Sequence, residues 1–320
     1  MIYVIFFIFS AFIFCKDERI EFESANPFSF EDIILYLEDQ DIQNVYGILK
    51  FPENHNKEKY PLIIGVAGSL GWKEHHHEFL QMYRDMGIAT FQLQSFESRG
   101  IESTVGSQTE VTIAAIVLDS YRALDELSKN PKIDAAKVGI TGWSLGGGVS
   151  LFAGWTPVIE SIQPENKFAA HLPFYPPCFV KPSKLDFVDS PVHILIGELD
   201  DWTPANPCMQ LIDDLHKTSN KYDNIDITVY DGAHHSFDSK LPITTIPNGY
   251  SFKDCMFDLS DEGVPLMNRV NIPMRSPILQ KIGFSFCVER GTTVGGNKNA
   301  REKSFEFAKL FMSKYLLEME

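Results

Sequence analysis

Positive charge is scarce in this sequence. Lysine and arginine contribute 28 residues against 43 aspartates and glutamates in a chain of 320, which leaves a net charge of −15. Nucleic acids and anionic membrane surfaces bind proteins through clustered positive charge, so this balance argues against both as partners. Internal repeats and low-complexity tracts are also lacking, which argues against a repeat architecture.

Cysteine is scarce as well. The five cysteines are Cys15, Cys178, Cys208, Cys255 and Cys287, and none belongs to a C-x-x-C motif. The chain therefore lacks the cysteine spacing typical of thiol redox enzymes and of zinc knuckles. We expect neither a metal nor another cofactor. Without Cys15, four cysteines permit three pairings. Proximity in the sequence favours Cys178 with Cys208 and Cys255 with Cys287.

No apolar run is long enough for a comfortable membrane span. Residues 1–15 (MIYVIFFIFSAFIFC) carry no charged side chain, but a span needs about 20 apolar residues. Their length is that of a signal-peptide hydrophobic region, although no lysine or arginine precedes it. We therefore expect removal of residues 1–15 and export to the periplasm or the extracellular space, with no stable span in the mature chain. A lipoprotein anchor on Cys15 and a buried N-terminal strand are the alternatives.

Apolar segments alternate with helical patterns through most of the chain. Apolar runs rich in β-branched residues predict strands at residues 61–67, 88–96, 138–141, 168–175, 192–197 and 225–230. Apolar residues at three- and four-residue steps predict helices at residues 75–86, 108–130 and 206–219. This alternation predicts an α/β fold with a mainly parallel, doubly wound sheet and helices on both faces.

The two ends of the chain depart from this alternation. Residues 19–52 alternate apolar and polar side chains in short pieces, which predicts antiparallel edge strands. Residues 241–290 lack clear periodicity and contain five prolines, so we expect an irregular excursion rather than a separate domain. Residues 299–320 predict a closing amphipathic helix. Residues 16–320 are therefore expected to form a single domain.

Residues 138–150 combine a strand, a sharp turn and the start of a helix. The turn is Gly142-Trp143-Ser144-Leu145-Gly146, a G-x-S-x-G sequence. A nucleophile elbow needs this order, because larger side chains two places on either side of the serine would collide. The pentapeptide alone is weak evidence, since a chain of this length contains it by chance about one time in ten.

An acid and a histidine follow Ser144, each just after a later predicted strand. Asp200 comes after the strand at residues 192–197, and His235 after the strand at residues 225–230. The carboxyl ends of parallel strands meet at one edge of a sheet, where ligands bind. The order serine, aspartate, histidine is that of the α/β-hydrolases.

These residue types suit nucleophilic catalysis. A serine hydroxyl attacks only when a base takes its proton, which we assign to His235 acting on Ser144. Asp200 would hold the imidazole in the required tautomer and stabilise its charged form. Their neighbours in the sequence, Asp201 and His234, are the alternatives for the acid and the base.

The oxyanion formed during attack needs two N–H donors. The elbow rule assigns one to the backbone of Leu145, the residue after the nucleophile. The other should come from the turn that follows the strand at residues 61–67. Ser69 is the first choice for this donor and Leu70 the second.

Six stretches of the sequence, taken together, form a pattern specific enough to indicate a family. They are Ser95–Gly100 (SFESRG), Gly142–Gly148 (GWSLGGG), Phe174–Cys178 (FYPPC), Gly197–Pro204 (GELDDWTP), Tyr230–Asp238 (YDGAHHSFD) and Gly291–Arg301 (GTTVGGNKNAR). They resemble the dienelactone hydrolase family of α/β-hydrolases, and the resemblance covers most of residues 60–238 and resumes at 291–314. It implies an α/β-hydrolase fold. It also matches the family's aspartate to Asp200 and its histidine to His235.

One position departs from this family. The dienelactone hydrolases that name it use cysteine at the elbow, where this chain has Ser144. The difference favours a broader carboxylic ester or lactone hydrolase over a dienelactone substrate. The resemblance also makes Arg99 a candidate for binding a substrate carboxylate, with a structural role as the alternative because loop arginines are more often structural. Trp72 and Trp143 flank the predicted site, where they either line an acyl pocket or pack in the core.

The remaining histidines favour structural interpretations. His75, His76 and His77 are consecutive, and consecutive residues of a helix do not face one ion, so a solvated helix start is favoured over a metal site. His171, on a predicted buried strand, is expected to be a core histidine with its hydrogen bonds satisfied.

The leading hypothesis from the sequence is a serine hydrolase of small carboxylic esters or lactones that works through an acyl-enzyme on Ser144. An acyltransferase would use the same three residues, with a different acceptor for the acyl group. A binding protein on a hydrolase fold, with its triad unused, is the third hypothesis. The sequence does not indicate an oligomeric state.

Overall fold

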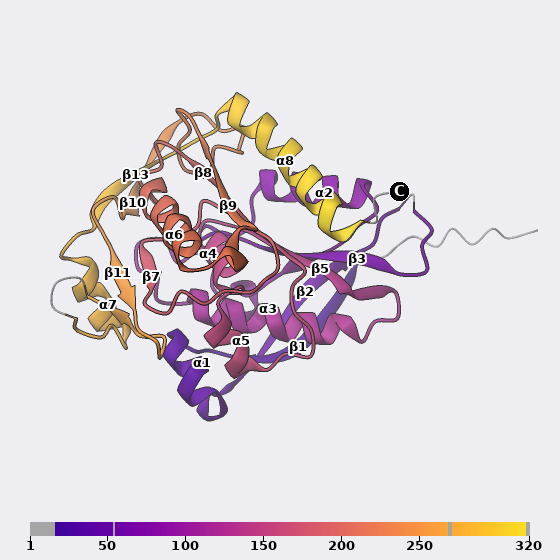
Figure 1. Cartoon of the computed structure of the whole chain (residues 1–320), viewed down its shortest axis with the longest axis horizontal. Coiled ribbons are helices and arrows are strands. Elements are labelled where there is room, and N and C mark those ends of the chain that lie inside the picture. The colour runs from indigo at the N-terminus through magenta and orange to yellow at the C-terminus, as the bar shows by residue number, and fades with distance from the viewer. Residues whose placement is uncertain (1–16, 54, 268–270, 318–320) are drawn as a thin grey trace, which may run out of the picture.

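The computed structural model describes residues 17–53, 55–267 and 271–317, so the predicted leader at residues 1–15 lies outside the described part of the chain. An eight-stranded sheet runs through the molecule, with its strands in the order β1-β2-β4-β3-β5-β6-β8-β9 (Figure 1). These strands are β1 (Glu18–Ala25), β2 (Ile42–Lys50), β3 (Tyr60–Val66), β4 (Ala89–Leu93), β5 (Ile133–Trp143), β6 (Ala170–Phe174), β8 (Val192–Gly197) and β9 (Ile225–Tyr230).

Most of the sheet is parallel, and its N-terminal edge is antiparallel. β4, β3, β5, β6, β8 and β9 pair in parallel, whereas β2 is antiparallel to both β1 and β4. Both features agree with the sequence-based expectation. β3 is buried along its whole length, because helices cover both faces of the sheet and leave neither face of a central strand in water.

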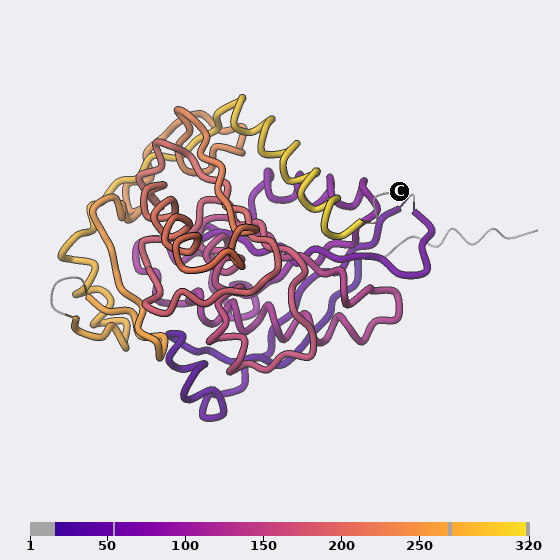
Figure 2. Tube along the Cα trace, in the orientation of Figure 1, coloured from indigo at the N-terminus to yellow at the C-terminus, as the bar shows by residue number. Residues whose placement is uncertain are grey.

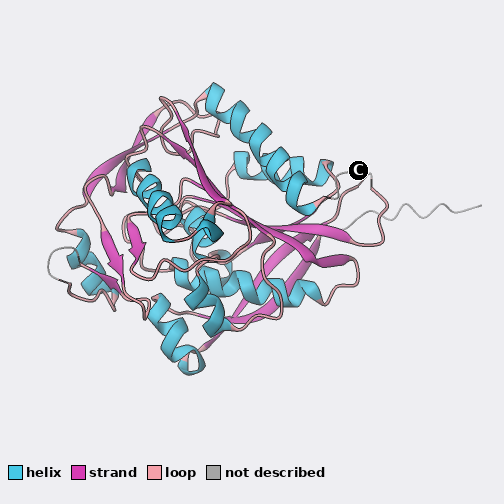
Figure 3. Ribbon diagram, viewed as in Figure 1, coloured by secondary structure: helices cyan, strands magenta, loops and turns pink. Residues whose placement is uncertain are grey.

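Helices cover the two faces as the doubly wound pattern predicts (Figures 1 and 3). α2 (Glu74–Asp85) and α8 (Lys298–Leu316) pack together on one face, and α3 (Ile113–Ser128) and α4 (Leu145–Phe152) pack on the other. α6 (Ala205–Thr218) contacts β8 and β9, while α1 (Phe30–Tyr36) and α5 (Thr156–Ile162) contact each other. The single turns η1 (Leu37–Asp39), η2 (Glu97–Arg99) and η3 (Asn220–Tyr222) are 3-10 helices. Among the described helices, none is both long enough and apolar enough to cross a membrane.

α3 begins later than the sequence predicts. The expected helix starts at Gln108, but the observed one starts at Ile113. Gln108 has a φ of 58°, which lies in the left-handed region and cannot continue a right-handed helix. Thr112 is the N-cap instead, and its hydroxyl accepts a hydrogen bond from the N–H of Ala115 at 3.2 Å.

The segment at residues 241–290 is more regular than expected. It contains β10 (Thr244–Ser251), β11 (Phe257–Leu259), β12 (Pro265–Leu266) and α7 (Pro277–Phe284). β10 pairs with β13 (Glu289–Val294), and β11 pairs in parallel with β7 (Val180–Pro182). β11 and β12 are only three and two residues long, and β10 and β11 each pair with a strand distant in the sequence, so no local periodicity reveals them.

A second apolar cluster holds this segment together. Its buried members are Phe179, Trp202, Tyr250, Phe252, Cys255, Phe257, Met267, Met274 and Phe284. The disulfide Cys255–Cys287 lies at this cluster, and the disulfide Cys178–Cys208 joins the chain before β7 to α6. Both pairings that proximity in the sequence favours are confirmed.

The same segment is anchored on the N-terminal part of the chain. Figure 2 shows its orange trace at one end of the molecule, beside the indigo trace that contains α1. Arg275 forms an ion pair with Glu31 of α1 at 2.7 Å, and the N–H of Glu31 donates to the carbonyl oxygen of Gly263 at 3.1 Å. Segments more than 200 residues apart thereby form one wall of the molecule.

His171 of β6 is fully buried. Its Nδ1 lies 2.9 Å from the carbonyl oxygen of Ser150, whereas Nε2 is buried without a hydrogen-bond partner. The expected core position is confirmed, but only one of the two ring nitrogens is satisfied. Burial lowers the pKa of His171 from 6.5 to about 4, so the ring stays neutral in the folded protein at neutral pH.

We expect His171 to contribute to loss of stability in acid. Between pH 6.5 and pH 4 the unfolded chain binds a proton at this ring while the folded chain does not, so acidification favours unfolding. The free energy of unfolding should fall by about 3 kcal/mol from this residue alone between pH 7 and pH 4. Urea unfolding at both pH values should show a decrease smaller by that amount in His171→Gln. An equal decrease in both proteins would contradict the assignment.

Candidate active site

Ser144 lies on the sharp turn between β5 and α4. Its backbone has a φ of 58° and a ψ of −115°, a conformation that costs about 1–3 kcal/mol for a residue with a side chain. The N–H of Ser144 donates to the carbonyl oxygen of Phe174 on the adjacent β6 at 3.0 Å. The turn therefore presents the serine at the carboxyl edge of the parallel sheet.

Gly142 and Gly146 permit the chain to pass through this turn. A Cβ atom on Gly142 would lie 2.1 Å from the carbonyl oxygen of Gly146, and a Cβ on Gly146 would lie 2.2 Å from the carbonyl oxygen of Val66. Cβ atoms do not approach backbone oxygens so closely, so both glycines are a steric requirement. The two outer positions of the G-x-S-x-G motif thus have a physical explanation in this chain.

His235 links Ser144 to Asp200. Its Nε2 lies 2.9 Å from Oγ of Ser144, and its Nδ1 lies 2.8 Å from Oδ2 of Asp200. The exposed fractions are 8% for Ser144, 2% for His235 and 4% for Asp200. The three predicted residues, which come from three separate loops, therefore form one hydrogen-bonded chain that is nearly removed from water.

The chain segment after β13 holds the His235 loop in place. The backbone of His235 forms a bridge with Val294, and its carbonyl oxygen accepts the N–H of Gly295 at 2.9 Å. The carbonyl oxygen of Phe237 accepts the N–H of Asn297 at 2.9 Å. The glycine-rich stretch at residues 291–301 therefore fixes the position of the histidine.

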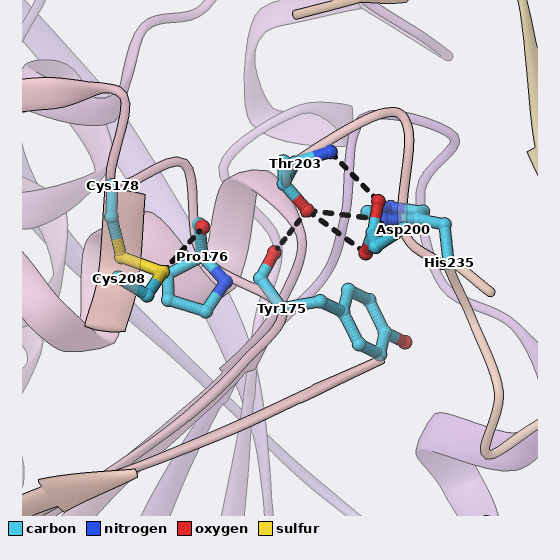
Figure 4. The surroundings of a disulfide bond; sticks show 7 residues. All are labelled: Tyr175, Pro176, Cys178, Asp200, Thr203, Cys208 and His235. Atoms are coloured by element: carbon cyan, nitrogen blue, oxygen red, sulfur yellow. Dashed lines mark hydrogen bonds and ion pairs between the residues drawn. A yellow bond between two sulfur atoms is a disulfide. The ribbon is translucent and has the colours of Figure 1, made fainter. Parts of the chain in front are cut away.

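Asp200 has several donors besides His235. Its Oδ1 accepts the backbone N–H groups of Trp202 and Thr203 at 3.0 and 2.8 Å. The hydroxyl oxygen of Thr203 lies 3.1 Å from Oδ2 of Asp200 and 2.9 Å from the carbonyl oxygen of Tyr175 (Figure 4). These contacts fix the direction in which the carboxylate faces the imidazole.

Two aromatic rings contact the imidazole of His235. The ring centroids of Tyr175 and Trp202 lie 4.5 and 5.0 Å from that of His235. The hydroxyl of Tyr175 donates to Oδ1 of Asp238 at 2.9 Å. Burial, together with the charge of Asp238, raises the pKa of Tyr175 well above its usual range, so this hydroxyl remains a donor. The imidazole is therefore confined by packing as well as by hydrogen bonds.

Asp201 and His234, the alternatives for the acid and the base, bond to other parts of the chain and not to Ser144 or to each other. Asp201 accepts the N–H and the hydroxyl of Thr293 at 2.8 and 2.9 Å, which ties β13 to this loop. Nδ1 of His234 lies 3.2 Å from the carbonyl oxygen of Leu199. Adjacent residues of an extended loop face opposite directions, and here Asp200 and His235 are the pair that meets.

Ser144 lies in the wall of a pocket, the kind of concave site in which small molecules bind. Leu145 and Ser69 line this pocket beside Ser144, whereas the side chain of Leu70 is 38% exposed. The N–H of Leu145 belongs to the first turn of α4, where no acceptor is available within the helix. A Cβ on Gly68 would lie 3.4 Å from that of Ser144, so the turn carrying Ser69 comes directly alongside the serine.

Arg99 does not contact this pocket. Its guanidinium makes a two-point ion pair with the buried Asp119, at 2.7 and 3.0 Å. Its remaining donors bond to Asn26 and to the backbone carbonyls of Ala25 and Ser95. The contacts of Arg99 favour the structural alternative over substrate binding, because all its donors hold loops and α3 together.

Trp72 and Trp143 also lie outside the pocket lining. Trp143 is fully buried, and its ring stacks on His76 and Phe174 at 4.4 and 5.5 Å. Trp72 contacts Trp143 edge-on and donates its indole N–H to the carbonyl oxygen of Leu93 at 3.2 Å. Trp143 is a core residue and Trp72 is a half-buried residue packed against the core, so both follow the packing alternative and not the acyl-pocket one.

Of the three consecutive histidines at the start of α2, His75 and His76 are buried, whereas His77 is exposed as a solvated helix start predicts. His76 is fully enclosed, and burial lowers its pKa well below the usual value. Its Nδ1 accepts the N–H of Lys73 at 3.2 Å, which caps α2. In the described ranges, no group of three or more potential ligands is arranged to hold a metal ion.

Sequence reasoning missed Thr203 and Gln108. Thr203 bonds to Asp200 and lies 3.2 Å from Nδ1 of His235, and its place three residues after the acid is the one signal that could have identified it. Oε1 of Gln108 accepts the hydroxyl of Ser69 at 3.2 Å. The apolar pattern predicts a helix that includes Gln108, so the sequence gives no sign that this residue lies at the pocket.

Comparison with known proteins relates this geometry to a family. The model of the dienelactone hydrolase family matches residues 57–253, which include Ser144, Asp200 and His235. The chain belongs to the dienelactone hydrolase family. The match ends within the segment at residues 241–290, so most of that segment lies beyond the matched region.

The individual relatives are more distant. A polyketide transferase from Gibberella fujikuroi is 29% identical over 160 residues, which are 48% of this chain and 45% of that protein. The chain therefore spans less than half the length of this curated relative. A candidate dienelactone hydrolase from Klebsiella pneumoniae superposes with a TM-score of 0.55 at 15% identity, covering 93% of this chain and all of its own. Esterase 2 from Thermogutta terrifontis gives a TM-score of 0.55 at 14% identity, covering 87% of this chain and 92% of its own.

These solved structures show the fold of this family member. At such low identity they indicate the arrangement of strands and helices and not the substrate. The central sheet and its helical layers are those of the α/β-hydrolase fold.

We expect Arg99 to affect stability rather than substrate binding. Arg99→Ala leaves the buried Asp119 without its cation, which should lower the free energy of unfolding by about 3–5 kcal/mol. The matched control is Arg19→Ala, which removes an ion pair with Glu21 on the exposed edge strand and should leave the free energy of unfolding nearly unchanged, because exposed ion pairs contribute little. Urea unfolding measures both. A stable Arg99→Ala protein with a raised KM would contradict this assignment.

Proposed function

We propose that this protein hydrolyses carboxylic esters, lactones included, through an acyl-enzyme on Ser144. The observation that carries the proposal is the continuous hydrogen-bonded chain from Ser144 through His235 to Asp200, beside a pocket. Membership of a hydrolase family supports it. The esterase from Thermogutta terrifontis with the same fold agrees with it.

The first half of the reaction forms the acyl-enzyme. Oγ of Ser144 attacks the ester carbonyl carbon while Nε2 of His235 takes its proton. The backbone N–H groups of Leu145 and Ser69 stabilise the negative charge on the carbonyl oxygen, and the N-terminus of α4 adds a favourable dipole. The tetrahedral intermediate collapses, the C–O bond to the alcohol breaks, and His235 returns the proton to the leaving alcohol oxygen.

The second half releases the acid. Water replaces the alcohol, His235 takes its proton, and the new oxygen attacks the acyl carbon. When the bond to Oγ of Ser144 breaks, His235 returns the proton to the serine. Asp200 keeps Nδ1 protonated and stabilises the imidazolium in both halves, so Nε2 faces Ser144 as an acceptor.

A fluorophosphonate probe tests the nucleophile. We expect one covalent adduct on Ser144 by intact mass and peptide mapping. Ser144→Ala should take up no probe and lose ester hydrolysis while its circular dichroism is unchanged. A folded Ser144→Ala protein that remained active would refute the proposal.

The adjacent aspartates provide a matched pair for the same test. Asp200→Asn should lower kcat/KM by about a thousandfold or more, because the imidazole loses its tautomer control. Asp201→Asn should retain most activity, since Asp201 does not bond to His235 and the asparagine oxygen can still accept the N–H of Thr293, which keeps the link to β13. Equal losses in the two variants would count against Asp200 as the triad acid.

Acyl transfer to an acceptor other than water is the second candidate. It is favoured by the similarity to the Gibberella fujikuroi polyketide transferase. If the protein is an acyltransferase, adding an alcohol or a thiol to the ester reaction should give mainly the new ester or thioester. For a hydrolase, product analysis by mass spectrometry should show mainly free acid at millimolar acceptor.

A further inference from the structure

The side chains that line the pocket beside Ser144 are uncharged. Among the described residues that form its walls there is no aspartate, glutamate, lysine, arginine or histidine. Seven aromatic residues line it: Phe28, Phe30, Phe152, Phe179, Trp202, Phe252 and Phe284. Such a wall favours apolar groups, because binding removes apolar surface from water on both sides.

The polar side chains of the wall are bonded to the protein itself. The hydroxyl of Thr112 donates to a backbone carbonyl at 2.9 Å, and that of Thr203 lies between the acid and a backbone carbonyl. Ser69 donates to the side chain of Gln108, and the amide of Gln280 donates to the carbonyl oxygen of Gln108 at 3.0 Å. The hydrogen-bonding capacity of these groups is therefore largely used within the protein before a substrate binds.

The outer wall is held in shape by stacked rings and disulfides. The rings of Phe179 and Phe252 stack with centroids 4.2 Å apart, and Phe252 meets Phe284 edge-on at 5.2 Å. Cys178, which precedes Phe179, is tied to α6, and Cys255–Cys287 joins the two ends of the chain that carries α7. The apolar wall is thus present before binding, which reduces the ordering that a substrate would require.

A charged substrate would find no partner here. Arg99, the cation that the sequence suggested for a carboxylate, has its donors engaged by Asp119 and neighbouring loops. Glu31, next to the wall residue Phe30, is already paired with Arg275. A carboxylate transferred into this pocket would lose its hydration without a compensating charge, which is strongly unfavourable.

We propose that the substrates of Ser144 are uncharged esters with an apolar acyl chain, and that the pocket rejects acyl chains ending in a carboxylate. The proposal rests on the ester hydrolysis inferred above and assigns its substrate class. The acyl chain lies against the phenylalanine wall while its carbonyl carbon is next to Oγ of Ser144.

A matched pair of substrates tests the charge preference. The p-nitrophenyl ester of hexanoic acid and the mono-p-nitrophenyl ester of adipic acid have the same leaving group and acyl chains of similar length, and the second ends in a carboxylate. We expect kcat/KM for the hexanoate to exceed that for the adipate by at least about 100-fold at neutral pH. Comparable values on the two substrates would overturn the proposal.

A variant with a new cation should reverse part of this preference. Val180 lines the pocket from β7. In Val180→Arg the ratio of adipate to hexanoate kcat/KM should rise by about tenfold or more, because the carboxylate gains a partner. Val180→Leu changes size without charge and should leave the ratio within about twofold. Fluorophosphonate labelling of Ser144 checks that both variants keep a working site.

The controls distinguish a failure of this substrate-class proposal from a failure of the proposed ester hydrolysis. If the probe labels Ser144 but the adipate is hydrolysed as well as the hexanoate, or neither is hydrolysed, the substrate class is wrong and the activated serine stands. If the probe does not label Ser144 and no ester is turned over, the proposed function fails and this inference fails with it.

Discussion

The close approach of three backbone segments around Ser144 is the constraint on which the rest of the site depends. The turn after β3, the end of β5 and the start of α4 meet with no room for a Cβ on Gly142 or Gly146. This contact holds Ser144 at a positive φ, in a conformation that an isolated chain would avoid. The strain directs Oγ toward His235 and places the first N–H groups of α4 beside it. Burial of the surrounding strands offsets its cost.

A second constraint connects the acid and histidine loops to the outer wall of the pocket. Asp200 faces His235, while its neighbour Asp201 bonds to Thr293 of β13. The end of β13 in turn holds the His235 loop through Val294 and Gly295. β13 also pairs with β10, which leads to the stacked phenylalanines. The geometry of the triad and the shape of the pocket therefore depend on the same strand.

Several elements could be predicted because their signals are local. β3, β8 and β9 are continuous apolar runs, and a strand buried on both faces must be apolar at every position. The three residues that meet at the sheet edge were identified because each follows such a strand. Family motifs carried the choice of Asp200 and His235 over their neighbours, and the geometry agrees with that choice.

The predictions that failed concern residues and strands whose contact partners are distant in the sequence. The family resemblance suggested Arg99 for a substrate carboxylate, and the sequence does not reveal that its partner is Asp119 of α3, 20 residues later. The predicted helix at residues 108–130 extended over Gln108, whose backbone is left-handed and whose hydrogen-bond partners Ser69 and Gln280 are distant in the sequence. The segment at residues 241–290 looked irregular because its short strands pair with β13 and β7.

The sequence by itself therefore determined the parallel sheet, the elbow and the identity of the three aligned residues. Strand hydrophobicity and glycine sterics act within a few residues, so they can be recognised in the chain alone. Only the tertiary structure decided that Arg99 is structural, that Trp72 and Trp143 pack in or against the core, and that the pocket has an uncharged aromatic wall. Those properties depend on which distant segments meet, and such contacts are set by packing and disulfides across the whole molecule.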